Sequence, residues 1–133
     1  MTFDLVVRNA QLASVPKGAP LQDIGITDGK IAAIGTGLAA EGEQLDAVGR
    51  LVSAGLIETH IHLDKSRILD RSEPAPDRGV DHMRRVGAVK PSFTVEDVYN
   101  RAQASLETSL VAGVTHMRTH VELDPNVGMK SFD

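Results

Sequence analysis

Residues 56–65, LIETHIHLDK, alternate ionisable with mainly apolar side chains, and this alternation limits the possible fold more than any other part of the sequence. The ionisable residues that share one parity are Glu58, His60, His62 and Asp64. Because successive side chains of a strand point to opposite faces, the pattern predicts a strand with one ionisable and one apolar face. Toward the N-terminus, the positions of the same parity back to Val52 are apolar. One strand within residues 51–64 is therefore expected, with its polar side chains near its C-terminal end.

A helix and a second strand are expected further along the chain. Thr94 and Asp97 form a pattern typical of a helix start, and apolar residues recur at spacings of three and four from Val95 to Leu110. Gly113 stands where a left-handed residue commonly ends a helix. The following strand repeats the alternation, with these residues on one face: His116, Arg118, His120 and Glu122.

The order of strand, long loop, helix and strand is that of a parallel-sheet unit. In a (β/α)₈ barrel the inward side chains pack a core, and the chemistry lies at the C-terminal ends of the strands. The polar strand ends therefore favour an α/β fold that begins such a barrel. We also expect an ion pair or a shared hydrogen-bond network between Glu58 and Arg118, because a charge in a barrel interior is rarely left unpaired.

The first fifty residues predict a small antiparallel β unit. Short strands are expected at 3–8, 9–15 and 43–48, and Asp28-Gly29 is typical of a two-residue hairpin turn between two further β-prone runs. We therefore expect two domains, a β unit over 1–50 and the start of a barrel over 51–133. The long loop between the barrel strand and the helix is expected to hold one or two helical turns within VDHMRR.

Composition excludes several classes of protein. The formal charge is −4 and aromatic residues make up 3%, so neither a basic patch nor base-stacking side chains indicate nucleic-acid binding. The chain has no cysteine, which excludes a disulfide framework and a thiolate metal site. No apolar run approaches the roughly 20 residues that span a bilayer, and the N-terminus lacks the pattern of a signal peptide. A cytoplasmic protein with no membrane partner is expected.

The pair His60 and His62 is a candidate metal site. Alternate residues on one strand face lie about 6.5–7 Å apart, so two imidazoles can converge on one ion. The same pair is also compatible with two exposed histidines or two histidines with other partners. Its position at the end of an inward-facing strand favours a metal, and imidazole alone does not choose among zinc, iron, copper and nickel.

The segment LVSAGLIETHIHLDK resembles the first barrel strand of the amidohydrolase superfamily, in which a His-x-His closes a strand that follows a Gly-ended turn. The resemblance covers residues 1–64, since family members open with a small β unit that carries a pattern like ITDGKIAAIG. The form HIHLDK, together with Arg118, Thr119 and His120 on the second strand, is most similar to the cytosine deaminase branch. Enzymes that hydrolyse amino-substituted triazine rings belong to the same branch.

This resemblance implies a hydrolase that deaminates a small heterocyclic substrate with one divalent ion, Zn²⁺ or Fe²⁺. The ion would be held by His60, His62, a later histidine and a late aspartate. The family's acid/base glutamate also lies on later strands, so no catalytic residue is expected within these 133 residues. A whole barrel takes about 250 residues. We therefore expect an N-terminal part of an enzyme that is inactive alone, and either a homo-oligomer or an association with the remainder of the barrel.

Two further residues are candidates for the substrate pocket, and two other functions remain open. Asp64 could touch substrate, orient a ligand histidine or cap the following turn, and His120 could line the pocket or fill a polar interior. The alternative functions are cyclic amide hydrolysis by a two-metal site of the same superfamily, and a non-catalytic half-barrel that needs a partner chain.

Overall fold

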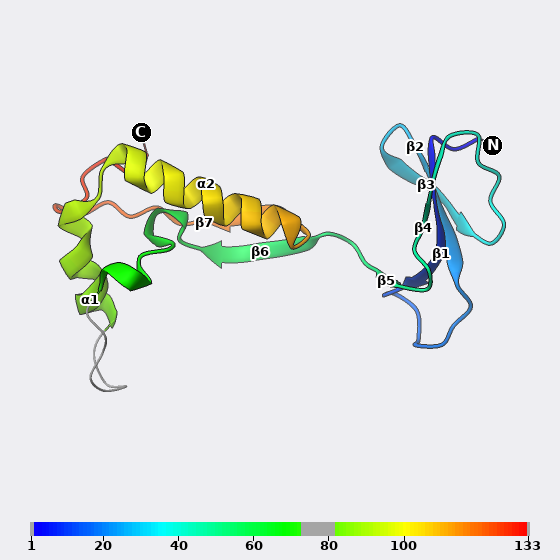
Figure 1. Cartoon of the computed structure of the whole chain (residues 1–133), viewed down its shortest axis with the longest axis horizontal. Coiled ribbons are helices and arrows are strands. Elements are labelled where there is room, and N and C mark those ends of the chain that lie inside the picture. Colours follow the sequence, from blue (N-terminus) through cyan, green and yellow to red (C-terminus); the bar gives the residue numbers. More distant parts are fainter. Residues whose placement is uncertain (1, 73–81, 133) are drawn as a thin grey trace. The chain divides into compact units, whose positions relative to one another are not determined.

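The computed structural model describes residues 2–72 and 82–132. Its contacts divide the chain into two compact units, with the division after Ala54 rather than after residue 50. The boundary moves because Leu51 and Val52 form a short strand, β5, that pairs with the first strand of the β unit. The two units are described separately below (Figure 1).

The first unit is a mixed sheet in the order β3-β2-β1-β4, with β5 also paired to β1. Its strands are β1 (Leu5–Leu12), β2 (Gln22–Thr27), β3 (Lys30–Gly35), β4 (Glu43–Asp46) and β5 (Leu51–Val52). The expectation of an antiparallel unit is wrong in part, because β4 and β5 both run parallel to β1. The two strands expected at 3–8 and 9–15 are also one strand, β1.

β1 is irregular near its middle, where its pairing partners change. Asn9 has a positive φ of 53°, and the pairing of β1 with β2 shifts between Val7 and Ala10. The half of β1 before this point pairs with β4, and the half after it pairs with β5. Asn9 is held in place because its side-chain nitrogen donates to Asp46 Oδ1 at 2.9 Å. One strand can therefore bind two successive segments along the same edge.

The hairpin predicted at Asp28-Gly29 is confirmed. The dipeptide joins β2 to β3, with φ values of 51° and 70° that fit the primed turns of tight hairpins. A part-buried ion pair, Arg8 Nη1 to Asp23 Oδ2 at 2.7 Å, ties β1 to β2. One core cluster of this unit is formed by Ala10, Ile24 and Ala47, and Phe3 and Val6 are also buried.

Over residues 55–72 and 82–132, the second unit contains two parallel strands and two α-helices. The strands are β6 (Leu56–Ile61) and β7 (Val114–Thr119), and the helices are α1 (His82–Val89) and α2 (Val95–Val111). Three short 3₁₀ turns complete it: η1 (Leu63–Lys65), η2 (Leu69–Arg71) and η3 (Lys90–Ser92). The helix α2 lies alongside the strand pair (Figure 1). This unit keeps the predicted order of strand, loop, helix and parallel strand.

The strand expected over 51–64 is divided between the two units. β5 belongs to the first sheet, and only β6 runs toward the histidine pair. The chain passes close to β7 at Gly55, where an added Cβ would collide with the side chain of Thr115. Glycine is required for that approach, and it interrupts the alternation that would have joined Val52 to Glu58.

Both ends of α2 follow the prediction. The side chain of Thr94 accepts a hydrogen bond from Asp97 N at 3.1 Å, and Gly113 follows the helix with a φ of 92°. Its apolar stripe is only partly covered, since Val98 is buried whereas Leu106 and Leu110 are exposed. The core of the unit is formed instead by these residues: Ile68, Val89, Phe93, Val98 and Val127.

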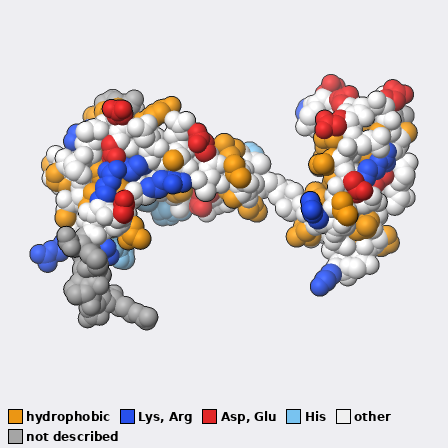
Figure 2. Space-filling model, viewed as in Figure 1, with side chains coloured by type: hydrophobic (Ala, Val, Ile, Leu, Met, Phe, Trp, Pro, Cys, Tyr) orange, Lys and Arg blue, Asp and Glu red, His pale blue; other side chains and the backbone are white. Residues whose placement is uncertain are grey.

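The loop between β6 and α2 holds more helix than the sequence predicts. Of the expected helical segment 80–85, residues 82–85 belong to α1, which continues to Val89. Residues 80 and 81 lie outside the described residues. Hydrophobic side chains remain on the surface of both units (Figure 2), among them Ile31, Leu51 and Ile57. Within residues 2–72 and 82–132, no helix is long and apolar enough to cross a membrane.

Candidate metal centre

Three histidines converge where β6 and β7 end. His60 is the fifth residue of β6, His62 follows the strand, and His120 follows β7. A hydrogen bond from His120 N to Ile61 O, 2.8 Å long, holds the two strand ends together. The ring centroids of His60 and His62 lie 5.6 Å apart, and that of His120 lies 4.3 Å from His60 and 5.4 Å from His62. The structure thus brings together three of the four histidines on the two predicted ionisable faces, and His116 is not among them.

The three imidazoles are suitable ligands for a divalent metal ion, but they do not by themselves form a complete metal site. Neutral imidazole is a good ligand for zinc and iron, and catalytic zinc sites usually have three protein ligands. Within the described residues, no group of three or more His, Cys, Asp or Glu side chains is arranged to hold a metal ion. His60 and His62 as ligands therefore stay a prediction, and a complete site needs donors from elsewhere.

The Nδ1 side of the His62 ring is buried against the protein. Its Nδ1 is buried without a hydrogen-bond partner and lies 3.7 Å from Asp64 Oδ1, which is also buried and without one. Burial and the nearby Lys65 ammonium lower the pKa of the His62 imidazole, which favours its neutral, metal-binding form. The side chain of His60, by contrast, is exposed.

Asp64 is the most buried ionisable residue beside the histidines, with 3% of its surface exposed. Its Oδ2 accepts a hydrogen bond from Glu122 N at 2.9 Å, which joins η1 to the segment after β7. Its carbonyl oxygen accepts from Arg101 Nη1 at 2.9 Å. Asp64 and His120 as substrate contacts stay predictions, but the geometry gives Asp64 a set of protein partners.

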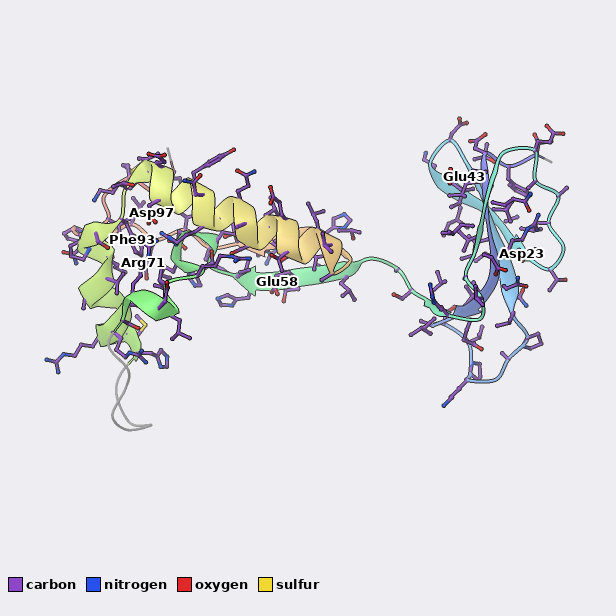
Figure 3. All side chains as sticks on the ribbon, viewed as in Figure 1. Asp23, Glu43, Glu58, Arg71, Phe93 and Asp97 are labelled. Carbon is purple, nitrogen blue, oxygen red and sulfur yellow. The ribbon has the colours of Figure 1, made fainter. Side chains whose placement is uncertain are left out.

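Arg101 is a buried residue beside the site that the sequence patterns did not indicate. It lies on α2, is 6% exposed, and also donates to Ser66 O at 2.8 Å. Asp97, one helical turn earlier, accepts from Arg101 Nε and Nη2 and from Arg71 at 2.6 Å. Figure 3 shows Arg71, Phe93 and Asp97 close together at the start of α2. The spacing of Asp97 and Arg101, i and i+4 on a helix, was the signal that could have found this contact.

A second ionic cluster lies at the same end of the strands. Glu122 accepts from Lys65 Nζ at 2.9 Å, and Lys90 Nζ lies 2.5 Å from its other oxygen. Lys90 is 9% exposed and also contacts Asp124 Oδ2 at 2.7 Å. Burial lowers the pKa of Lys90, but its hydrogen bonds to the two carboxylates outweigh this and raise it. The cluster ties η3 to the chain after β7.

The predicted ion pair between Glu58 and Arg118 is wrong. The ladder pairs Glu58 with Met117, one position away from Arg118, because the register shifts on either side of this point. Paired residues of parallel strands share a face, so Arg118 points to the opposite one. Glu58 instead accepts a hydrogen bond from His60 N at 2.8 Å within its own strand. Among the described residues, no ion pair joins Glu58 to Arg118.

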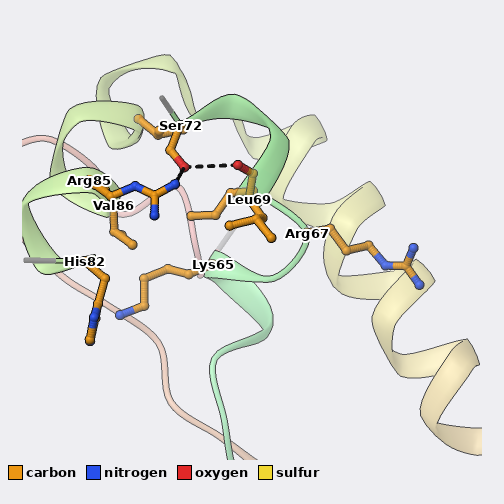
Figure 4. Close-up of a pocket in the computed structure, with 9 residues that line it drawn as sticks. Lys65, Arg67, Leu69, Ser72, His82, Arg85 and Val86 are labelled. Atoms are coloured by element: carbon orange, nitrogen blue, oxygen red, sulfur yellow. Dashed lines mark hydrogen bonds between the residues drawn. The ribbon is translucent and has the colours of Figure 1, made fainter. Parts of the chain in front are cut away.

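A cavity of about 240 Å³ lies between the loop after η1 and α1 (Figure 4). It borders the histidine site through Lys65, and its walls include the apolar side chains of Ile68 and Val86. Arg85 Nη2 donates to Ser72 Oγ at 2.8 Å across one wall, whereas the guanidinium of Arg67 points away toward α2.

No family model matches the chain. Among curated proteins, the N-isopropylammelide isopropyl amidohydrolase of Pseudomonas sp. strain ADP is 30% identical over 140 residues, which covers 98% of this chain and 33% of that protein. The allantoinase of Bacillus licheniformis is 41% identical over 63 residues, which covers 47% of this chain and 14% of that protein. The chain therefore spans a third or less of the length of these relatives.

Two solved structures are similar over nearly the whole chain. An N-isopropylammelide isopropylaminohydrolase from Burkholderia multivorans has a TM-score of 0.74 and 25% identity, and the match covers 96% of this chain and 32% of that one. A 5-methylcytosine deaminase from Klebsiella pneumoniae, liganded with 5-fluorocytosine, has a TM-score of 0.72 and 31% identity with the same coverage.

Proposed function

The chain belongs to the amidohydrolase superfamily, a family of hydrolases, and we propose that it supplies the first metal ligands of an enzyme that deaminates an amino-substituted nitrogen heterocycle. In this proposal β6, α2 and β7 begin a (β/α)₈ barrel, and the β unit precedes it. The observation that carries the proposal is the convergence of His60, His62 and His120 at the C-terminal ends of two parallel strands.

His60 and His62 would hold one divalent ion, Zn²⁺ or Fe²⁺, together with ligands from later parts of a longer chain. When bound, such an ion lowers the pKa of a coordinated water toward neutrality. Partial burial and the Lys65 ammonium lower the pKa of His62 and so favour its neutral form, whereas the side chains of His60 and His120 are exposed.

The substrate class is supported by the relatives, which include a deaminase solved with 5-fluorocytosine and an isopropylaminohydrolase. In the proposed reaction, water forms a C–O bond at the ring carbon that carries the amino group, the C–N bond breaks, and ammonia or an amine leaves. His120, whose ring lies 4.3 Å from that of His60, would line the pocket beside the ion. The group that transfers the proton would be a glutamate on a later strand.

The exposed strands support an association with further protein. Leu56 is 56% exposed and Ile57 is 67% exposed, although both belong to β6. Two parallel strands alone leave both sheet edges unpaired, whereas parallel sheets are normally covered on both faces. We therefore propose that the remainder of a barrel, or a second copy of the chain, covers these strands.

Cyclic amide hydrolysis is the second candidate, and the similarity to an allantoinase favours it. That similarity covers 47% of the chain, less than the 98% covered by the amidohydrolase relative, so deamination is the better-supported reaction.

The test uses a protein of the relatives' length that contains residues 1–133, purified with Zn²⁺ or Fe²⁺. We expect ammonia release from cytosine or from an aminotriazine, and loss of that release in His60→Ala. Ring opening of a cyclic amide without ammonia release from either heterocycle would replace deamination by the second candidate.

A further inference from the structure

We propose that Asp64 sets the tautomer of His62, by accepting a hydrogen bond from Nδ1 and leaving Nε2 without a proton. The inference rests on the metal site of the proposed function and adds to it a positioning residue that acts through His62. It concerns residues of this chain alone, so it can be tested without a metal.

Two buried atoms that face each other carry the inference. His62 Nδ1 and Asp64 Oδ1 are both buried, both lack a hydrogen-bond partner, and lie 3.7 Å apart. Each of the two atoms has almost no surface open to solvent, so the nearest group that can serve as the partner of one is the other.

The other contacts of Asp64 decide which of the two atoms donates. An ionised carboxylate accepts hydrogen bonds and donates none, so His62 must carry its proton on Nδ1. The remaining carboxylate oxygen is already used by Glu122 N, and Arg101 holds the carbonyl oxygen of Asp64. The carboxylate is thus fixed toward the ring. Histidines that bind metals commonly donate their second ring N–H to a carboxylate in this way.

Asp64→Asn tests the inference, because an amide accepts a hydrogen bond at its oxygen and donates one from its nitrogen. Glu122 N is a donor, so the amide oxygen must take the position of Oδ2. The amide nitrogen then faces His62 Nδ1 and donates to it. The variant should therefore move the proton of His62 to Nε2, where it blocks a metal, without any change in side-chain shape.

The experiment reads the tautomer by long-range ¹H–¹⁵N correlation on the ¹⁵N-labelled chain 1–133 at pH 8, without metal. The chain has five histidines, and His62 is assigned by its loss in His62→Gln. We expect the Nδ1–H form in the wild type and the Nε2–H form in Asp64→Asn. Titration with Zn²⁺ should then show at least a roughly tenfold higher Kd for the variant. Asp70→Asn removes an equal charge at an exposed residue and should change neither result.

A wild-type chain with His62 in the Nε2–H form would overturn the inference, and so would an Asp64→Asn variant that keeps the wild-type tautomer. If Asp64→Asn does not fold, as judged by circular dichroism, the wild-type tautomer alone decides. An Nδ1–H ring in a longer protein that binds no Zn²⁺ would count against the proposed function and leave the role of Asp64 intact.

Discussion

Arg101 Nη1 donates a 2.9 Å hydrogen bond to the carbonyl oxygen of Asp64, and this bond joins α2 to the turn that follows the histidine pair. The same guanidinium pairs with Asp97 and lies over the ring of Phe93, with Cζ 4.6 Å from the ring centroid. A single buried cation therefore connects the helix, the turn and the apolar core of the second unit.

The first prediction concerns this cation. Arg101→Met should lower the free energy of unfolding by about 3 kcal/mol, because it leaves two carbonyl oxygens and part of Asp97 without their donor. Urea unfolding measured by circular dichroism checks the value. Arg67→Met is the matched control, since Arg67 also donates to α2 but is exposed, and its loss should cost less than about 1 kcal/mol. Equal losses in the two variants would contradict the prediction.

The second prediction concerns acid. The hydrogen bond from Arg71, with those from Arg101, outweighs burial and lowers the pKa of Asp97 from 3.8 to about 2. A carboxyl whose pKa is lower in the folded chain stabilises the fold above its unfolded pKa, and this contribution is lost as pH falls through the folded pKa. Asp97 should thus contribute about 2 kcal/mol at pH 5 and progressively less between about pH 4 and pH 2.

Urea unfolding across this pH range checks the second prediction. The difference in stability between the wild type and Asp97→Asn should shrink as the pH falls from 4 to 2. Asp70→Asn, which changes an exposed carboxylate, should show a small difference at every pH. A constant difference for Asp97→Asn would show that its carboxylate is not the group that titrates.

The third prediction concerns metal content. A protein of the relatives' length that contains this chain should copurify with one Zn²⁺ or Fe²⁺, and His60→Ala or His62→Ala should remove most of it. His116→Ala is the control, because His116 lies on β7 away from the three-histidine cluster and bonds to Thr115. Elemental analysis is the measurement, and equal metal in all variants would exclude the pair as ligands.

The fourth prediction is that residues 1–133 alone have no deaminase activity. Two ligands are fewer than the three protein ligands usual in catalytic zinc sites. The proton-transferring glutamate is also expected outside this segment, and its absence typically costs about 10²–10⁴ in rate. The purified chain with added Zn²⁺ or Fe²⁺ is assayed for ammonia release from cytosine and aminotriazines. Turnover above the metal blank that His60→Ala abolishes would refute the prediction.

Local sequence signals predicted the elements that depend on one backbone conformation. Asp28-Gly29 forms the hairpin and Gly113 follows the helix, because few residues adopt positive φ easily. Thr94 caps α2 because its hydroxyl can reach a free backbone amide of the first turn. The strand patterns placed His60, His62 and His120 at the ends of two neighbouring strands, and the structure brings the three rings together there.

Features that depend on pairing between distant segments were not predicted. The parallel pairing of β4 with β1 joins segments more than 30 residues apart, and no local pattern in either segment indicates it. The predicted contact between Glu58 and Arg118 was wrong because it required a particular register of β6 and β7. These strands are joined by a long connection, so no tight turn fixes their register. Arg101 also bonds to the carbonyl oxygens of Asp64 and Ser66, which are more than 30 residues away, and the apolar pattern of a helix does not indicate such contacts.

The pairing of β5 with β1 also sets an order of events on the ribosome. All strands of the first sheet lie within residues 5–52, so this sheet can form as soon as that stretch has emerged. β6 must wait for β7, which is synthesised about 50 residues later, or roughly 3–10 s at ordinary rates of translation. During that interval the newborn chain carries a finished sheet and, later in its sequence, a strand that has no partner strand to pair with.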